Sequence, residues 1–378
     1  MKVGIIGGGI AGLTTALALQ KAGIEFHLFE QSPEFREVGA GILLNTSTYF
    51  LLNQLGVGED FIAMSIPIYH FTIANFHDAK VRDVPFKKHG YSIHRARLID
   101  VLKKPLQPHQ YTLNARIEKV HQSVTKATII ANEIEYEFDI VIAADGIHSA
   151  TRHQFLPLVK PRYTQQTMWR GISTFDMPAQ FKDCIYELWG NNKRFGVMDL
   201  GNGKYFWYTV TWAKEGGKDD EATVKDDIKK IFSEYHLNVH ELIDRSEPII
   251  RTDVRDMEPA DFTWFNNRIV FVGDCIHATT PHLSQGACQS IESAYTIVAC
   301  LVKHQNNIHA AFEQYQQLRK NKAQMLNQLS YFFGRFSHQR KAWQDGLINL
   351  GLKVVPQAYI NFKYDQSVDL KYLKDLHL

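Results

Sequence analysis

The sequence has few cysteines, no long apolar segment and no excess of charge of one sign. Its four cysteines among 378 residues are Cys184, Cys275, Cys288 and Cys300. They lack the close spacing of metal ligands, so we expect reduced, mostly buried thiols and no metal site. No segment has the length and apolar character of a transmembrane helix. The 42 Lys and Arg against 40 Asp and Glu give a net charge of +2, which does not indicate a nucleic-acid partner.

The N-terminus has one Lys followed by an apolar run, which is also how secretory signals begin. Its glycines, however, occur at the spacing of a phosphate-binding loop, and no cleavage region follows them. We therefore reject a signal peptide and expect a cytoplasmic protein without stable membrane anchoring. The length allows one large domain or two interleaved ones.

The first motif is a glycine-rich turn between an apolar strand and an amphipathic helix. Residues 7–12 read GGGIAG, a match to GxGxxG, and a second strand ends at Glu30. Strand, turn, helix, strand and acid in this order predict a dinucleotide site. Gly7 would make the tight turn, Gly9 would admit the pyrophosphate and Gly12 would allow close packing of helix on sheet, while Glu30 would bind a ribose. The motif alone does not separate FAD from NAD.

The second motif lies in residues 268–293, RIVFVGDCIHATTPHLSQGACQSIES. A short apolar strand ends at Gly273-Asp274, which places an acid where open α/β sheets bind ligands. Gln285-Gly286-Ala287 opens a long helix, whose free N–H groups favour negative charge. The alternative is an ordinary strand, loop and helix.

Two further segments point to the same kind of ligand. The apolar run IVIAA leads into Asp145-Gly146, with Ser149 and Arg152 behind it; the alternative is a capped helix start. The segment REVGAGI (36–42) suggests backbone close to a flat ligand, or a plain glycine-rich loop. Arg95, at a predicted helix start, could reach a pyrophosphate or could be a solvated surface residue.

Residues 162–212 differ in character from the rest of the chain. Aromatic-rich segments alternate as strands do, which predicts a large antiparallel sheet with one buried face and the wall of a substrate site. Beyond it we expect a charged helix over 219–235, a strand over 247–254 and helices over 308–336 and about 343–352. The C-terminal helix is expected to pack on the body of the protein.

Three of these motifs together resemble those of the FAD-dependent aromatic hydroxylases, the single-component class A flavoprotein monooxygenases. They are GxGxxG with Glu30, Asp145-Gly146 with Ser149 and Arg152, and Gly273-Asp274 with Pro281 and Gln285-Gly286. REVGAGI, His94-Arg95-Ala96 and QGACQSIE are similar to the branch of salicylate hydroxylase, urate hydroxylase and zeaxanthin epoxidase. The resemblance covers residues 1–155 and 262–320 well. It implies an α/β fold: a Rossmann-like FAD-binding domain (1–66, 93–160 and 262–330), interleaved with an antiparallel-sheet substrate domain (67–92 and 161–261) and followed by C-terminal helices (331–378).

The resemblance also assigns roles. Glu30 would bind the adenosine ribose, Arg95 the pyrophosphate side and Asp274 the ribitol, while Asp145 would support the flavin. The loop 281–287 would contact the isoalloxazine, and we call it the flavin loop. The full set of expected cofactor-binding residues is Gly7, Gly9, Ala11, Gly12, Glu30, Gln31, Arg36, Leu43, Arg95, Ile117, Asp145, Asp274, Pro281, Leu283, Ser284, Gln285, Gly286 and Ala287. Ser284 departs from the family, which usually has a glycine there.

The implied reaction starts with reduction of non-covalent FAD by NADH or NADPH. Oxygen then forms a flavin C4a-hydroperoxide, which hydroxylates a small aromatic or heteroaromatic substrate. Candidates for base catalysis are Tyr208, His277 and His282, each with an ordinary structural role as the alternative. Arg194 is a candidate for contact with the substrate, and a solvated strand-edge arginine is the alternative.

Two rival functions remain open at this point. One is an FAD-dependent epoxidase or reductase that acts on an isoprenoid or polyene. The other is a non-catalytic flavin-binding protein, against which the intact Asp274, Pro281 and Gly286 argue. The substrate, the choice between NADH and NADPH and the oligomeric state have no signature in the sequence.

Overall fold

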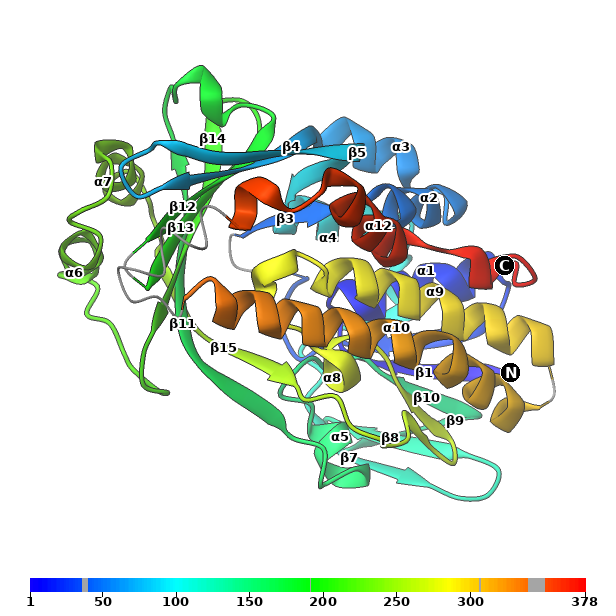
Figure 1. The fold of residues 1–378 in the computed structure, drawn as a ribbon. Coiled ribbons are helices and arrows are strands. Elements are labelled where there is room, and N and C mark those ends of the chain that lie inside the picture. Colours follow the sequence, from blue (N-terminus) through cyan, green and yellow to red (C-terminus); the bar gives the residue numbers. More distant parts are fainter. Residues whose placement is uncertain (36–39, 191, 306, 339–350) are drawn as a thin grey trace.

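The computed structural model describes residues 1–35, 40–190, 192–305, 307–338 and 351–378. Its strands form three sheets (Figure 1). The strands are β1 (Lys2–Ile6), β2 (Glu25–Phe29), β3 (Gly41–Leu44), β4 (Ile66–Asn75), β5 (Lys80–His94), β6 (Tyr111–Thr112), β7 (Ile117–Gln122), β8 (Ala127–Ala131), β9 (Ile134–Phe138), β10 (Ile140–Ala143), β11 (Pro161–Thr174), β12 (Cys184–Gly190), β13 (Lys193–Asp199), β14 (Lys204–Trp212), β15 (Ile250–Met257), β16 (Phe265–Asn266) and β17 (Ile269–Phe271).

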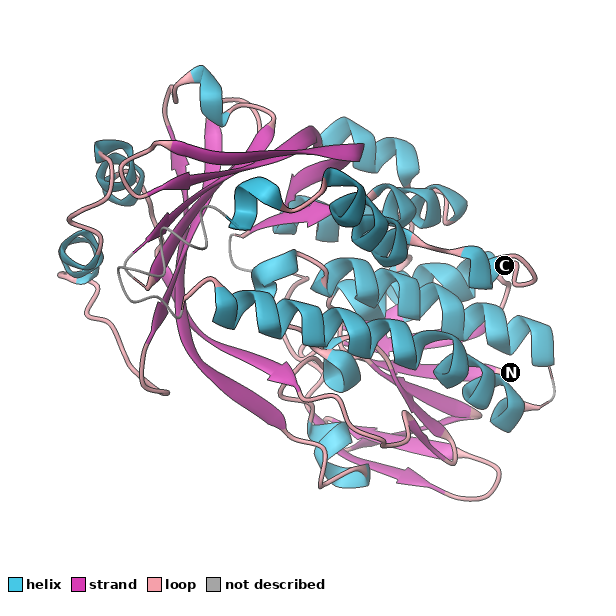
Figure 2. Cartoon of the chain, viewed as in Figure 1, coloured by secondary structure: helices cyan, strands magenta, loops and turns pink. Residues whose placement is uncertain are grey.

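Helices flank these sheets (Figure 2). They are α1 (Ile10–Lys21), α2 (Thr46–Gln54), α3 (Gly58–Met64), α4 (Arg95–Lys103), α5 (Ala150–Phe155), α6 (Val224–Ile231), α7 (Leu237–Asp244), α8 (Asp274–His277), α9 (Gly286–His304), α10 (Ile308–Phe336) and α12 (Gln357–Val368). Four short 3-10 turns are η1 (Pro108–Gln110), η2 (Ala179–Phe181), η3 (Pro281–Leu283) and η4 (Lys371–Leu373).

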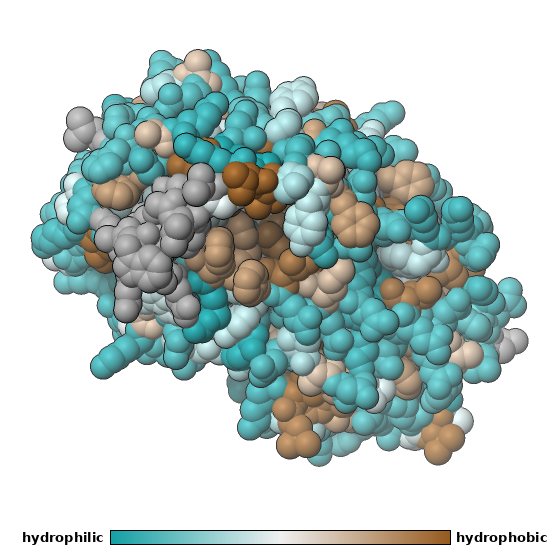
Figure 3. Space-filling model, in the orientation of Figure 1, coloured by the Kyte–Doolittle hydropathy of each residue, from teal (hydrophilic) through white to brown (hydrophobic). Residues whose placement is uncertain are grey.

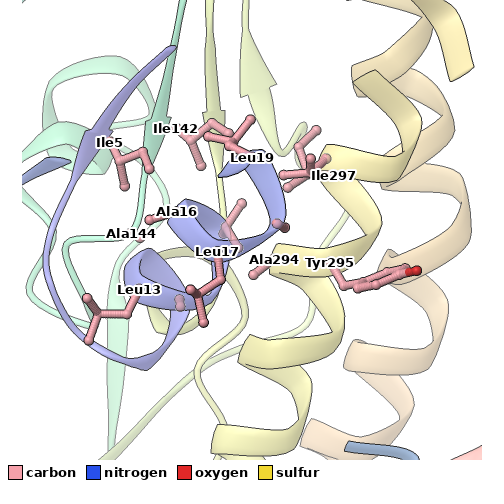
Figure 4. Close-up of a cluster of buried hydrophobic side chains, with 14 of the residues drawn as sticks. Ile5, Leu13, Ala16, Leu17, Leu19, Ile142, Ala144, Ala294, Tyr295 and Ile297 are labelled. Carbon is pink, nitrogen blue, oxygen red and sulfur yellow. The ribbon is translucent and has the colours of Figure 1, made fainter. Parts of the chain in front are cut away.

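The first sheet has the strand order β16-β17-β10-β1-β2-β6, and β1 runs parallel to both β10 and β2. Its central strands are apolar on both faces because α1 and α9 cover one face and the three-stranded sheet β7-β8-β9 packs on the other, where Ile129 and Phe138 lie against Gly4 of β1. Figure 4 shows side chains from β1, β10, α1 and α9 meeting in this core, among them Ile5, Ile142, Leu17 and Ile297. This core fixes α1 and α9 with their N-termini at the carboxyl end of the sheet.

The second sheet has the order β15-β11-β14-β13-β12-β4-β5-β3. The strands of residues 162–212 pair antiparallel as predicted, whereas β12 pairs with β4 in parallel. The two strands are far apart in sequence, so no hairpin dictates their relative direction. β3 also belongs to this sheet, although its residues lie within the range 1–66 expected for the cofactor domain.

Element boundaries differ from the expected ones in instructive ways. The helix expected over 308–336 is α10, whereas the helix expected over 219–235 shrinks to α6. The reason lies at Asp219, whose carboxylate accepts hydrogen bonds from Trp169 Nε1 at 2.7 Å and from Arg251 Nη1 at 2.9 Å. These bonds hold the segment along the sheet instead of in a helix. The helix expected over about 343–352 lies largely outside the described residues.

All four cysteines are free and buried, as the sequence predicted. Within the described ranges, no helix combines the length and apolar character needed to cross a bilayer.

Candidate functional site

The glycine-rich turn joins β1 to α1 as its spacing predicted. Gly7 has φ +101°, and a Cβ on Gly12 would lie 1.8 Å from the Gly7 carbonyl oxygen, so both positions require glycine. At the end of β2, Glu30 accepts hydrogen bonds from the backbone N–H of Gly8 at 2.6 Å and of Ser32 at 2.8 Å. The acid is therefore held beside the turn.

Two clefts meet at this turn. The first, of about 640 Å³, is lined by the turn and by Glu30, Gln31, Ile117 and Asp145. The second, of about 290 Å³, lies between the first sheet, α9 and the inner face of the second sheet. Gly9, Ala144 and Gly146 line both clefts, so the two form one elongated site. The site suits an extended ligand with two parts.

Asp274 and Arg95 both line the second cleft, and each supports the charge of the other. Burial raises the pKa of Asp274, and the positive charge of Arg95 opposes that rise. The pKa of Arg95 falls to about 10 because of its own burial, although Asp274 supports its charge. The pair places a carboxylate and a guanidinium at the carboxyl end of the sheet, where polar groups of a ligand would meet them.

The N-terminus of α9 lines the second cleft through Gly286 and Ala287. A Cβ on Gly286 would contact only Thr279 Cγ2, at 3.9 Å, so the protein itself leaves room for a side chain there. The absence of a side chain is explained by close approach of a ligand to the helix N-terminus, where N–H groups and the helix dipole favour negative charge.

A buried polar network lies behind the wall of the second cleft. Glu187 accepts hydrogen bonds from the Tyr208 hydroxyl and from Trp189 Nε1, the latter at 2.6 Å. Arg194 lies 3.4 Å from Glu187 and donates to His282 Nδ1 at 2.5 Å. His282 Nε2 then reaches Gln166 Oε1 at 2.9 Å. Strand β12 contributes Glu187 and Trp189, strands β11, β13 and β14 contribute one member each, and His282 belongs to the flavin loop.

The hydrogen bonds and charges of this network determine the protonation states of His282 and Tyr208. Since Arg194 can only donate, His282 Nδ1 accepts, and the proton of the imidazole is on Nε2. Burial and the charge of Arg194 lower the pKa of His282 well below its usual value, so the ring is neutral. Burial and Glu187 raise the pKa of Tyr208 well above its usual range. Neither group is arranged as a free base.

The comparisons with known proteins agree with this geometry. The family model described as "FAD binding domain" matches residues 1–330. The chain belongs to this family. An aurachin C monooxygenase/isomerase from Stigmatella aurantiaca is 33% identical over 91% of this chain and 92% of its own length. A 2-heptyl-3-hydroxy-4(1H)-quinolone synthase from Pseudomonas aeruginosa is 25% identical, over 95% of each chain.

Among solved structures, Klebsiella pneumoniae HpxO complexed with FAD and uric acid superposes with a TM-score of 0.89 at 22% identity, covering 97% of this chain and 96% of the other. A salicylate hydroxylase substrate complex has a TM-score of 0.79. These two likenesses concern the fold. With the family match and the relatives, they make the chain a class A flavoprotein monooxygenase that uses FAD and NAD(P)H, as the sequence predicted.

The residues present fit FAD. Asp145 Oδ1, Thr279 Oγ1 and Gln285 Oε1 are buried without a hydrogen-bond partner among the described residues, and a ligand in the clefts would supply one. Glu30 and the turn would hold the adenosine end, and Arg95 with Asp274 would hold the middle. The α9 N-terminus would face the flavin. When bound, the flavin supplies the hydride acceptor and the oxygen-activating ring of this family.

Most expected cofactor residues line the clefts. Those in the first cleft are Gly7, Gly9, Glu30, Gln31, Ile117 and Asp145, and those in the second are Gly9, Ala11, Leu43, Arg95, Asp274, Pro281, Ser284, Gly286 and Ala287. Gly12, Leu283 and Gln285 lie beside the clefts without lining them, and Arg36 lies outside the described residues.

The candidates for substrate contact or base catalysis differ in whether they line the second cleft. Tyr208 lines the second cleft, whereas Arg194, His277 and His282 do not. The alternative of a solvated strand-edge arginine was wrong, because Arg194 is fully buried. Arg152, part of the Asp-Gly motif, is likewise structural: it donates to the carbonyls of Cys275, Ile147 and Val159.

Sequence reasoning missed Glu187 and Arg170. Arg170 shares the inner face of β11 with Met168 and Ile172, and Met168 also lines the second cleft. A lone arginine in an apolar row of a strand was the available signal.

Proposed function

We propose that this monooxygenase acts on a fused heteroaromatic ring that carries a hydrocarbon chain, of the alkyl-4(1H)-quinolone class, with O2 as the oxidant. The observation that carries the proposal is the apolar wall that continues beyond the second cleft. Ala40, Leu43, Phe206 and Tyr208 line the cleft and also belong to a larger apolar cluster. Its other members are Ile68, Phe71, Phe86, Ile172, Ile185, Met198 and Leu200.

Several members of this cluster are only half-buried, notably Leu43, Phe71, Phe86 and Ile172. They form an apolar surface that extends along the second sheet for longer than one planar ring needs. Figure 3 shows apolar side chains gathered in a hollow on the viewed side of the molecule. The exposed Phe332 and Phe336 stack on each other at the C-terminal end of α10. Such a surface favours a substrate with a hydrocarbon chain, since each methylene that is buried on binding contributes about 0.8 kcal/mol to the binding free energy.

Two relatives support this choice of substrate. The name of the Pseudomonas aeruginosa relative specifies a 4(1H)-quinolone with a heptyl chain and a hydroxyl at position 3. The more similar aurachin C relative is both a monooxygenase and an isomerase. Hydroxylation at position 3, on the ring carbon beside the carbon that carries the oxygen at position 4, is consistent with the oxygen transfer of this family.

The chain's own residues would have three tasks in the reaction. The wall formed by Met168, Phe206 and Tyr208 would hold the ring flat over the flavin. The apolar cluster would exclude water, which protects reactive intermediates from hydrolysis. The α9 N-terminus would offset the negative charge of the reduced flavin.

The test compares 2-heptyl-4(1H)-quinolone, 4(1H)-quinolone, urate and 3-hydroxybenzoate as substrates of the FAD-loaded enzyme. We expect NAD(P)H-dependent O2 uptake and a product heavier by one oxygen atom with the heptyl compound, and a KM at least about tenfold lower than for the compound without the chain. A lower KM for urate or 3-hydroxybenzoate would overturn the proposed class. A polyene assayed beside these four compounds tests the rival reaction, which would give an epoxide.

A matched pair of variants tests whether the apolar cluster binds the hydrocarbon chain of the substrate. Phe71→Gln should raise KM for 2-heptyl-4(1H)-quinolone and leave KM for 4(1H)-quinolone unchanged. Phe50→Gln, at an exposed phenylalanine on α2 outside both clefts, should change neither. Equal effects of the two substitutions would contradict the assignment of the apolar cluster.

A further inference from the structure

Arg170 lines the second cleft, and no acidic side chain among the described residues balances its charge. It lies on β11 opposite Tyr208 of β14. Its Nε is buried without a partner, and no hydrogen bond or ion pair of the guanidinium is formed with any described residue. The side chain therefore presents several unused N–H donors to the cleft.

The three fully buried arginines each bond to protein groups through their guanidinium, although Nε of Arg194, like that of Arg170, has no partner among the described residues. Arg194 has Glu187 and His282, Arg319 lies 2.7 Å from Glu292, and Arg152 has three carbonyl oxygens. Removing a guanidinium from water without such partners costs free energy. Burial lowers the pKa of Arg170 accordingly. Arg170 is half-buried and has no such partner, so its guanidinium is open to a ligand in the cleft.

The charges around the second cleft define that ligand. The ionisable side chains among its lining residues are Arg95, Arg170, Tyr208 and Asp274. Arg170 lies close enough to Arg95 to lower the pKa of the latter, and only Asp274 carries negative charge. With Tyr208 neutral, the lining carries a net positive charge, which favours an anionic oxygen.

The same lining residues include no suitable base. The Tyr208 hydroxyl donates to Glu187, and Arg95 supports the negative charge of Asp274. His282, which the sequence suggested as a base, has both ring nitrogens engaged behind the wall. An aromatic hydroxyl that enters the cleft therefore has no described lining group that would take its proton.

We propose that Arg170 binds, as an oxyanion, the oxygen that is attached to the aromatic ring of the substrate. A hydroxylated or tautomerisable ring is then ionised on binding, and its proton leaves to solvent. The O–H or N–H bond of the substrate breaks, its electron pair stays on the substrate as the oxyanion, and the proton passes to solvent water; no other covalent bond changes in this step. The oxyanion donates electron density into the ring and makes the neighbouring carbon more reactive toward an electrophilic oxygen. The proposal rests on the monooxygenase assignment and not on the hydrocarbon chain of the substrate.

The experiment uses the FAD-loaded enzyme and 4-nitrophenol, whose absorption spectrum reports its protonation state. We expect the parent enzyme to bind the phenolate, to lower the apparent pKa of the bound phenol and to prefer 4-nitrophenol over nitrobenzene. Arg170→Met should weaken phenolate binding about 10- to 100-fold, the value of a charge-assisted hydrogen bond, and abolish the preference. Arg170→Lys should retain part of it. Binding of the protonated phenol, or an unchanged preference in Arg170→Met, would overturn the proposal.

A second measurement separates the substrate from the reduced flavin, which is the other anion that could reach Arg170. The flavin midpoint potential of Arg170→Met is measured without a ligand. A potential close to that of the parent supports a substrate oxyanion as the partner. A clearly lower potential together with unchanged 4-nitrophenol binding would assign Arg170 to the flavin and overturn the proposal. Both readouts are independent of turnover, so failure of the quinolone assays leaves them interpretable.

Discussion

The Nη2 atom of Arg194 lies 2.5 Å from Nδ1 of His282, and this contact joins the second sheet to the flavin loop. Gln166 extends the connection, because its side-chain amide accepts from His282 and donates to the carbonyl of Gly334 in α10 at 3.1 Å. A Cβ on Gly334 would lie 2.1 Å from His282 Cδ2, so this glycine makes room for the ring. The network thus ties together the three parts of the chain that surround the second cleft.

Arg194→Met tests whether this arginine is structural. The substitution leaves Glu187 buried without its cation, so we expect the free energy of unfolding to fall by about 3–5 kcal/mol, as for a broken buried ion pair. Urea unfolding of the apoprotein measures the change. Arg245→Met, which removes an exposed arginine paired with Glu241, is the control and should lower stability by less than about 1 kcal/mol. Unchanged stability with a higher substrate KM would instead return Arg194 to substrate binding.

The cofactor half of the site was predictable because its motifs are local. Gly7, Gly12 and Glu30 act through a turn and the strand next to it, so their spacing in sequence fixes their geometry. Asp274 and Gly286 are likewise twelve residues apart in one strand–loop–helix unit. In such cases the chemistry of the residue and its local element suffice.

The substrate half was less predictable because its contacts join distant segments. Arg194 looked like an edge residue from its own strand, and its burial depends on Glu187 of the neighbouring strand and on His282, 88 residues further along the chain. The parallel pairing of β4 with β12 has the same origin, since no local pattern sets it. Arg170 was overlooked because only the cleft distinguishes it from other strand arginines.

Asp274→Ala tests the carboxylate at the end of β17. Loss of a charge-assisted hydrogen bond to FAD should cost about 1–3 kcal/mol, which corresponds to roughly 5- to 150-fold weaker binding. Titration of the apoprotein with FAD, followed by flavin fluorescence, gives the dissociation constant. Asp261→Ala, at a fully exposed carboxylate, should bind FAD like the parent. An unchanged dissociation constant in Asp274→Ala would place the carboxylate outside the cofactor site.

His277 should make the protein sensitive to acid. Burial lowers its pKa to about 3, with the charge of Arg319 adding to the effect. Below the unfolded pKa of about 6.5, the unfolded state binds a proton that the folded state refuses, so stability falls as the pH drops from about 6.5 toward 3. His277→Gln should reduce the slope of unfolding free energy against pH by roughly 1.4 kcal/mol per pH unit in that window. His121→Gln, at an exposed histidine, should keep the parent slope; a His277→Gln slope equal to the parent's would contradict the shift.

Ser284→Gly tests the departure of the flavin loop from its family. Ser284 has φ +53° and ψ +32°, a left-handed conformation that a side chain disfavours by about 1–2 kcal/mol. Glycine relieves this strain but loses more entropy on folding, so we expect a net gain of up to about 1 kcal/mol in unfolding free energy. Ser65→Gly, at a serine with φ −109°, should not stabilise the protein. Destabilisation by Ser284→Gly would show that the serine hydroxyl matters more than the backbone.

Gly286 should matter to the cofactor and not to the fold. Since a Cβ there would contact only Thr279 Cγ2, at 3.9 Å, the apoproteins of Gly286→Ala and Gly286→Val should unfold at temperatures close to that of the parent. A side chain between the α9 N-terminus and the flavin would nevertheless separate the helix dipole from the charge of the reduced ring. We therefore expect FAD affinity and the flavin midpoint potential to fall in the order parent, Ala, Val. Gly12→Ala provides the contrast, because its Cβ would lie 1.8 Å from the Gly7 carbonyl oxygen and should reduce apoprotein stability and FAD binding together. If Gly286→Val bound FAD with the parent's affinity and potential, the flavin would not lie against this helix, and the orientation of the cofactor in the two clefts would have to be reversed.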